Sequence, residues 1–381
     1  MPSPTACAVG LTLLFAKMSH TIPVKPWLRW TVFLLLFEAA VSSAPAAFTA
    51  LYAFGDGTCT TTSNTTGGSL YYGDSYSNGR IWIQVLAERL GLTYVASNNV
   101  SYYGQYSINL VTNVTSFIAP TNASNCLFIV WVSDADLVSG MQKINPLYDT
   151  NQWATLLNQS LTNQLKSLQI LYNKGVRTLV LPNAVDITEV PLYNTTATST
   201  RSVIRAQITN FNANFAAALT SFAATNSGLK IYSPDIFSLL DNVLTNAATY
   251  GLTNVLSGGL SIDAQENQQY AFTGPGENYI FWDPTDPTAR FHEVIADYIQ
   301  QLVSPAQINW VTPLGNSNRL DVINFPAGLN GFVDGTTNLA STNWQPVMSF
   351  TNAGTTQTLY VTNSGPEHYY RLRFPYAWYW P

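Results

Sequence analysis

Charged residues are scarce in this chain. Only 10% of its 381 residues are Asp, Glu, Lys or Arg, whereas roughly 25% is usual for a soluble protein. Lys and Arg number 16 and the formal net charge is −5. No basic patch can be assembled to hold phosphates, so we expect no nucleic-acid partner. The polar surface must come mainly from Asn, Thr, Ser and Gln, which suits a secreted protein.

Histidine and cysteine are also rare, with three of each. After residue 46 only His292, His368, Cys59 and Cys126 remain. Cys59 follows one expected strand, whereas Cys126 precedes the next. If those strands are parallel, the thiols lie at opposite ends of the sheet, roughly 16 Å apart, so no disulfide is expected.

Residues 1–46 have the pattern of a signal peptide. Lys25 and Arg29 precede an apolar run over residues 30–37, and small residues with an Ala-x-Ala pattern follow. The run is too short for a comfortable membrane span, and no other segment reaches the ~18 apolar residues that a span needs. We expect an extracellular or periplasmic protein with no membrane span after leader cleavage. An uncleaved anchor and a start at Met18 are the alternatives.

Strand and helix patterns alternate from residue 47 to residue 304. The strands are short apolar runs, predicted over 48–54, 127–132, 178–182, 230–232 and 279–282. The helices have apolar residues at helical spacing and are predicted over 81–92, 152–174, 201–225, 235–245 and 288–303. This alternation predicts a three-layer α/β domain, a doubly wound parallel sheet with helices on both faces.

The pattern changes at residue 305. Short β-prone runs at 346–350, 358–362 and 369–374 alternate with Gly, Asn and Pro, and no helical periodicity is visible. We therefore predict a small antiparallel, β-sandwich-like module over 305–381. Its strongly aromatic end, 374–381, either binds sugar rings or packs onto the protein's own core.

Several sequence blocks, in order, resemble the SGNH/GDSL hydrolase family of esterases and lipases. Phe54–Gly57 is similar to the family's Phe-Gly-Asp-Ser block up to its last residue, and Tyr76–Trp82 to Phe-Ser-Asn-Gly-x-x-Trp. Asn99–Gly104 resembles the second block, Trp131–Leu137 the block Trp-Ile-Gly-x-Asn-Asp-Leu, and Phe281–Thr288 the block Phe-Trp-Asp-x-x-His-Pro-Thr. The resemblance runs from Tyr52 to Val303 and implies an SGNH-hydrolase-like, flavodoxin-like fold.

The resemblance also implies roles for individual positions. In that family a serine attacks the ester carbonyl, a histidine takes the proton, and an aspartate three residues earlier orients the imidazole. Gly57 stands at the serine position, Ala135 at the oxyanion-stabilising asparagine and Asp286 at the histidine. Asp283 keeps the aspartate position, and Gly104 keeps the glycine whose N–H serves the oxyanion hole. A hydrolase acting on ester bonds is implied, with weak or no activity.

Other side chains are expected beside the crevice. Asp56, Tyr102, Tyr103 and Asp136 are the candidates, and the tyrosines either line a sugar platform or fill the space. His292 should point along its helix and away from the crevice.

Two hypotheses remain open. The first is a degenerate esterase that binds a glycan or acyl ligand in the old crevice; the alternative is an active ester hydrolase with a rearranged catalytic site. The carboxylates Asp56, Asp283 and Asp286 could serve acid–base chemistry, hold Ca²⁺ or stabilise the fold. We expect no cofactor and no metal, and a small-molecule ester or carbohydrate as the partner.

Overall fold

The computed structural model describes residues 48–145, 147–340, 342–352, 354–362, 369–374 and 378–380. For residues 378–380 it describes the backbone only. The expected leader, residues 1–46, and His368 lie outside these ranges. So do the side chains of the aromatic C-terminal end from Pro375 onward.

A parallel sheet of four strands forms the centre of the α/β domain. The strands are β1 (Leu51–Gly55), β2 (Leu127–Trp131), β3 (Thr178–Val180) and β4 (Lys230–Tyr232), and they lie in the order β1-β2-β3-β4. Beyond β1, Asn99 makes a single parallel bridge to Ala53. Asn99 thus lies on one side of β1, whereas β2, β3 and β4 follow on the other side, so the direction of strand addition reverses between β1 and β2. In doubly wound sheets, ligands bind at such a reversal.

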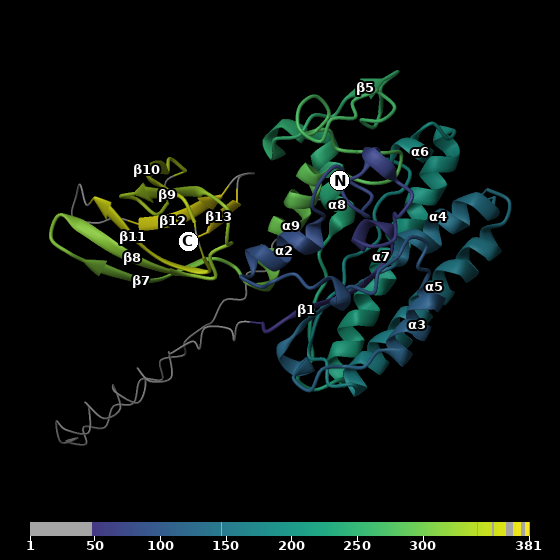
Figure 1. Cartoon of the computed structure of the whole chain (residues 1–381), viewed down its shortest axis with the longest axis horizontal. Helices are drawn as coiled ribbons and strands as arrows, with labels where there is room; N and C mark the ends of the chain where they lie inside the picture. The colour runs from purple at the N-terminus through teal and green to yellow at the C-terminus, as the bar shows by residue number, and fades with distance from the viewer. Residues whose placement is uncertain are drawn as a thin grey trace, which may run out of the picture. The chain divides into compact units, whose positions relative to one another are not determined.

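Helices cover both faces of this sheet (Figure 1). One face packs against α2 (Trp82–Arg89), α8 (Ile236–Thr245) and α9 (Ala289–Val303). The other packs against α3 (Ser107–Ser116), α5 (Thr150–Asn173) and α7 (Thr198–Thr225). Helix α4 (Ser133–Lys143) follows β2, and the short helix α6 (Pro191–Asn194) lies between β3 and α7. The three-layer, doubly wound prediction is confirmed.

Side-chain alternation along the strands explains the two cores. In β1, Leu51 and Ala53 belong to the core on one face, whereas Phe54 belongs to the core on the other. All five residues of β2 are buried, as expected for a central parallel strand covered on both faces.

Two features differ from the sequence prediction. The expected strand over 279–282 is wrong, because these residues form a closed turn: Trp282 N donates to Asp286 O (2.8 Å) and Thr288 N donates to Ile280 O (3.1 Å). Helices α3, α4 and α6 were not predicted. The first two are rich in Ser, Thr, Asn and Asp, which mask the apolar spacing, and α6 has only 4 residues.

The C-terminal part is a sandwich of two antiparallel sheets. One sheet has the order β10 (Gln345–Phe350), β9 (Gly331–Thr336), β12 (Tyr369–Phe374) and β13 (Trp378–Trp380). The other has the order β11 (Thr356–Thr362), β8 (Ser317–Ile323) and β7 (Gln307–Pro313). A single core cluster joins residues of both sheets. The predicted antiparallel module is confirmed.

Both cysteines in the described ranges, Cys59 and Cys126, are buried free thiols. Within the same ranges, no helix combines the length and the apolar character that a bilayer span requires.

Candidate active site

The first part of the site follows the end of β1. Asp56 precedes a single 3-10 turn, Gly57–Cys59, and its Oδ1 accepts a hydrogen bond from Thr58 N (3.2 Å). A Cβ atom on Gly57 would lie 3.1 Å from Tyr103 Cδ2 and 3.8 Å from Asp286 Oδ1. Position 57 therefore points toward the side chain of residue 286, beneath the ring of Tyr103.

The second part follows the end of β2, where α4 begins at once. Asp134 is in the first turn of α4, and its Oδ1 accepts from Val185 N (3.0 Å). Ala135 lines the cavity described below. Asp136 lies outside that cavity; its carboxylate accepts from Ser107 N (3.3 Å) at the start of α3.

The third part is the turn before α9. Asp283 Oδ1 accepts from Thr285 N (2.9 Å) and Asp286 N (2.7 Å), while its Oδ2 accepts from Tyr71 Oη (2.8 Å). Asp286 Oδ2 accepts from Thr285 Oγ1 (2.8 Å). Asp283 therefore fixes the turn that presents Asp286 to the cavity.

These three parts line one cavity of about 230 Å³ that opens to solvent. Its polar side includes Asp56, Asp134 and Asp286. Its apolar side is formed by residues from α4, the loop after β3, α8 and α9: Val138, Val185, Ile187, Val190, Ile236, Leu240, Phe291 and Ile295. No Lys, Arg or His is among the described residues that line it. The cavity therefore has an acidic side and an apolar side that is aliphatic apart from Phe291, called the aliphatic wall below.

The carboxyl groups of the polar side are buried. Burial raises the pKa of Asp56 to about 7, although the N–H groups of Thr58 and Ala135 partly offset this effect. Burial, and then the neighbouring charge of Asp56, raises the pKa of Asp134 well above its usual range. Burial, and then the charge of Asp283, does the same to the pKa of Asp286. Near neutral pH the cluster retains protons, so its members both donate and accept hydrogen bonds.

The second sequence block lies at the mouth of the cavity. Gly104 lines it and has φ = 72°, a left-handed conformation suited to glycine. Tyr103 also lines it, although its side chain is 60% exposed, and its ring lies 5.2 Å from that of Tyr76. Tyr102 does not line the cavity; its N–H donates to Gly55 O (3.2 Å). The ring of Tyr103 thus occupies the space above Gly57.

The described part of the α/β domain holds one histidine, His292, and a thiol, Cys59, in the turn that follows β1. His292 is 1% exposed, does not line the cavity, and burial lowers its pKa to about 3. Cys59 is also buried, and burial raises the pKa of its thiol well above the usual range. Neither residue lines the cavity, and a thiol that stays protonated is a poor nucleophile, so the two do not supply a nucleophile–base pair there.

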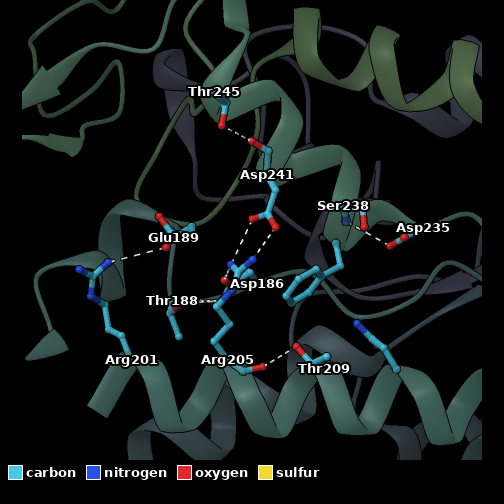
Figure 2. A network of polar contacts seen from close by, with 12 residues as sticks. Asp186, Thr188, Glu189, Arg201, Arg205, Thr209, Asp235, Ser238, Asp241 and Thr245 are labelled. Atoms are coloured by element: carbon cyan, nitrogen blue, oxygen red, sulfur yellow. Dashed lines mark hydrogen bonds and ion pairs between the residues drawn. The ribbon is translucent and has the colours of Figure 1, made fainter. Parts of the chain in front are cut away.

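The aliphatic wall was not predicted from the sequence. Much of it comes from the loop after β3, which Figure 2 shows held between α7 and α8. Arg205 of α7 forms ion pairs with Asp186 of this loop and with Asp241 of α8. Asp186 is fully buried, and its Oδ1 also accepts from Thr188 N (3.0 Å). This network fixes the backbone beside Val185, a residue of the wall.

No group of three or more His, Cys, Asp or Glu side chains within the described ranges is arranged to hold a metal ion. Asp56, Asp134 and Asp286 share the cavity without forming such a group.

Comparison with known proteins then decides the family. The model of the GDSL-like Lipase/Acylhydrolase family matches residues 51–299. The chain belongs to this family. The resemblance seen in the sequence is confirmed, and it spans nearly the whole α/β domain.

Two curated relatives illustrate the membership. An acetylesterase of Thermothelomyces thermophilus is 28% identical over 218 residues, which is 51% of this chain and 70% of the relative. The GDSL esterase/lipase EXL3 of Arabidopsis thaliana is 24% identical over 250 residues, 60% of this chain and 66% of the relative. The chain thus spans about two thirds of their lengths.

Among solved structures, LAE5, an alpha/beta hydrolase enzyme from a lake metagenome, aligns with a TM-score of 0.40 and 13% identity over 68% of this chain and 97% of that chain. Axe2, an acetylxylan esterase from Geobacillus stearothermophilus, aligns with a TM-score of 0.39 and 12% identity over 68% of this chain and 96% of that chain.

Proposed function

We propose that this member of the GDSL esterase/lipase family binds a neutral ligand with a short acyl group and does not hydrolyse it by serine chemistry. The observation that carries the proposal is the convergence of Gly57, Ala135 and Asp286 on one cavity. In the family resemblance these are the nucleophile, oxyanion-donor and base positions. Losing any one triad member costs several powers of ten in rate.

The lining of the cavity supports a neutral, amphiphilic ligand. The aliphatic wall suits an acyl or alkyl group, which gains free energy by leaving water. The carboxyl side suits a hydroxyl or a carbonyl, because protonated carboxyl groups donate and ionised ones accept. An anionic ligand would add a negative charge beside Asp56, which is ionised above about pH 7, and no Lys, Arg or His among the described residues lines the cavity to balance it.

The size of the cavity suits a small ligand. At about 30 Å³ for each water-sized group, a volume of about 230 Å³ holds roughly eight non-hydrogen atoms. At about 0.5 kcal/mol per atom, such a ligand binds with roughly −4 kcal/mol, a Kd near 1 mM. A longer glycan would leave most of its length outside.

A second candidate function is hydrolysis by the carboxyl groups themselves. The pKa of Asp56, about 7, lies where a general acid or base works best at neutral pH. This is the form of a rearranged catalytic site that the lining residues favour.

Secretion is part of the proposal. It is supported by the leader-like pattern of residues 1–46 and by the low content of charged residues. The proposed ligand is a small ester or an acylated carbohydrate, not a nucleic acid.

The test uses butyl acetate, which has eight non-hydrogen atoms, with butanoate as the anionic control. Saturation-transfer NMR at pH 8 is expected to detect binding of the ester and not of the anion. The acetate signal in the same sample should stay at the level of buffer alone. Protein-dependent release of acetate would overturn the proposal and favour the second candidate.

Two variants locate the binding. Ala135→Leu fills the cavity and should abolish saturation transfer. Ala217→Leu makes the same change on an exposed position of α7 and should leave the transfer intact. Circular dichroism of both variants checks that they are folded. Equal transfer in the two variants would mean that the ester binds elsewhere.

A further inference from the structure

The outer face of the sheet formed by β7, β8 and β11 carries two exposed aromatic rings. In β8, Leu320 points into the core, so Arg319 and Asp321 point outward. Trp310 of β7 pairs with Asp321, and Tyr360 of β11 pairs with Arg319. Directly opposed residues of antiparallel strands share a face. Both rings therefore lie on the outer face of one sheet, whose strands Figure 1 shows side by side.

Both rings are largely exposed to solvent. Trp310 is 62% exposed and Tyr360 is 60% exposed. Among the described residues, neither has an aromatic neighbour in stacking or edge geometry, or a cation over its ring. The other sheet of the sandwich differs, because its exposed ring Phe332 lies under the guanidinium of Arg373, at 4.3 Å from the ring centroid. The exposed faces of Trp310 and Tyr360 are therefore accessible to a ligand.

Hydrogen-bonding groups lie between the rings. Arg319 Nη2 is 2.9 Å from Asp321 Oδ2, and Thr358 Oγ1 donates to Asp321 Oδ1 (2.7 Å). Thr312 pairs with Arg319 on the same face. The positive and the negative charge balance each other, so this face has no net charge. It offers flat apolar rings at two ends and polar groups in the middle.

The spacing of the rings follows from the register. They are two strands apart, at ~4.8 Å per strand, and offset by two residues, at ~3.4 Å per residue. Their Cα atoms are therefore roughly 12 Å apart, a span that accommodates a short run of sugar rings.

We propose that this face binds a neutral polysaccharide chain, with the C–H faces of two sugar rings stacked on Trp310 and Tyr360. Sugar hydroxyls would then bond to Arg319 and Asp321, which lie between the stacked rings. A sugar matches this face because it has flat C–H surfaces and many hydroxyl groups, and no charge. A lipid surface fits less well, since burying the central ion pair in hydrocarbon is costly. Nucleic acid is disfavoured, because no cationic excess is present to neutralise phosphates.

This face is distinct from the cavity of the α/β domain, so polysaccharide binding and ligand binding in the cavity can be tested independently. The full chain is titrated calorimetrically with xylohexaose and with cellohexaose. Binding of at least one is expected. Trp310→Ala and Tyr360→Ala should each weaken it roughly tenfold or more, as central aromatic contacts do.

The matched control is Tyr148→Ala, which removes an 82% exposed ring from the loop before α5 and should leave affinity unchanged. The cavity-filling variant Ala135→Leu should also bind normally. The proposal would be overturned if the protein bound neither hexasaccharide. So would binding that survives both ring substitutions, or a dimer in light scattering that Trp310→Ala dissociates, since a second copy would then be the occupant.

Discussion

The substitution Asp56→Asn probes the buried carboxyl cluster through its effect on stability. The pKa of Asp56 is about 7 in the folded protein, against an ordinary value of 3.8. The folded state therefore binds this proton more tightly than the unfolded state. Stability is lost as pH rises from about 4 to about 7, because the buried carboxyl must then ionise. Asparagine has nearly the same shape, can still accept from Thr58 N, and cannot ionise.

The magnitude follows from the difference in pKa. A shift of 7 − 3.8 = 3.2 units at 1.36 kcal/mol per unit gives about 4 kcal/mol. Asp56→Asn is therefore expected to raise the free energy of unfolding by up to about 4 kcal/mol at pH 8. The gain should shrink toward zero near pH 4.

Urea unfolding followed by tryptophan fluorescence at pH 4.5, 6 and 8 measures this gain. The control Asp74→Asn changes an exposed carboxyl and should alter the free energy little at any pH. The reasoning would be refuted by a loss of stability at pH 8, since ionised Asp56 would then be stabilising. A gain of equal size at all three pH values would refute it as well.

Two further substitutions test the scaffold of the site. Arg205→Met leaves the buried carboxylate of Asp186 without its countercharge, and should cost on the order of 2–3 kcal/mol in urea unfolding, since Arg205 is partly exposed. Adding Asp186→Asn should restore part of that loss. Gly140→Ala places a Cβ atom 1.9 Å from Trp153 Cζ3, so the melting temperature should fall by the equivalent of about 1–3 kcal/mol. Gly354→Ala meets nothing within 4 Å and should melt like the parent.

Much of the fold could be predicted from the sequence because its core elements are strongly patterned. The continuous apolar run of β2 and the long amphipathic repeats of α5 and α7 leave little choice of structure. The strand predicted over 279–282 was wrong because an apolar, aromatic segment forms a buried turn as readily as a strand. Which one forms depends on Asp286 and Thr288, whose backbone groups close the turn.

The site could be predicted only where a residue directly follows a strand. Gly57 and Ala135 meet because the ends of β1 and β2 are adjacent. Asp136 could not be placed without knowing that α4 begins at Ser133. Residues two apart on a helix point roughly 200° apart, so Asp134 faces the cavity and Asp136 faces α3. The aliphatic wall could not be predicted from the sequence, because loop residues such as Ile187 have the same apolar character as residues of the hydrophobic core.

The central claim is that the family's pocket is present without its serine chemistry. The most direct test is hydrolysis of short-chain p-nitrophenyl esters by the parent chain beside the variant Gly57→Ser/Ala135→Asn/Asp286→His. A side chain at position 57 would lie within about 4 Å of residue 286, so the restored pair can meet. We predict background rates for the parent and clear turnover by the variant. Turnover by the parent that Asp286→Ala or Cys59→Ala abolishes would contradict the account.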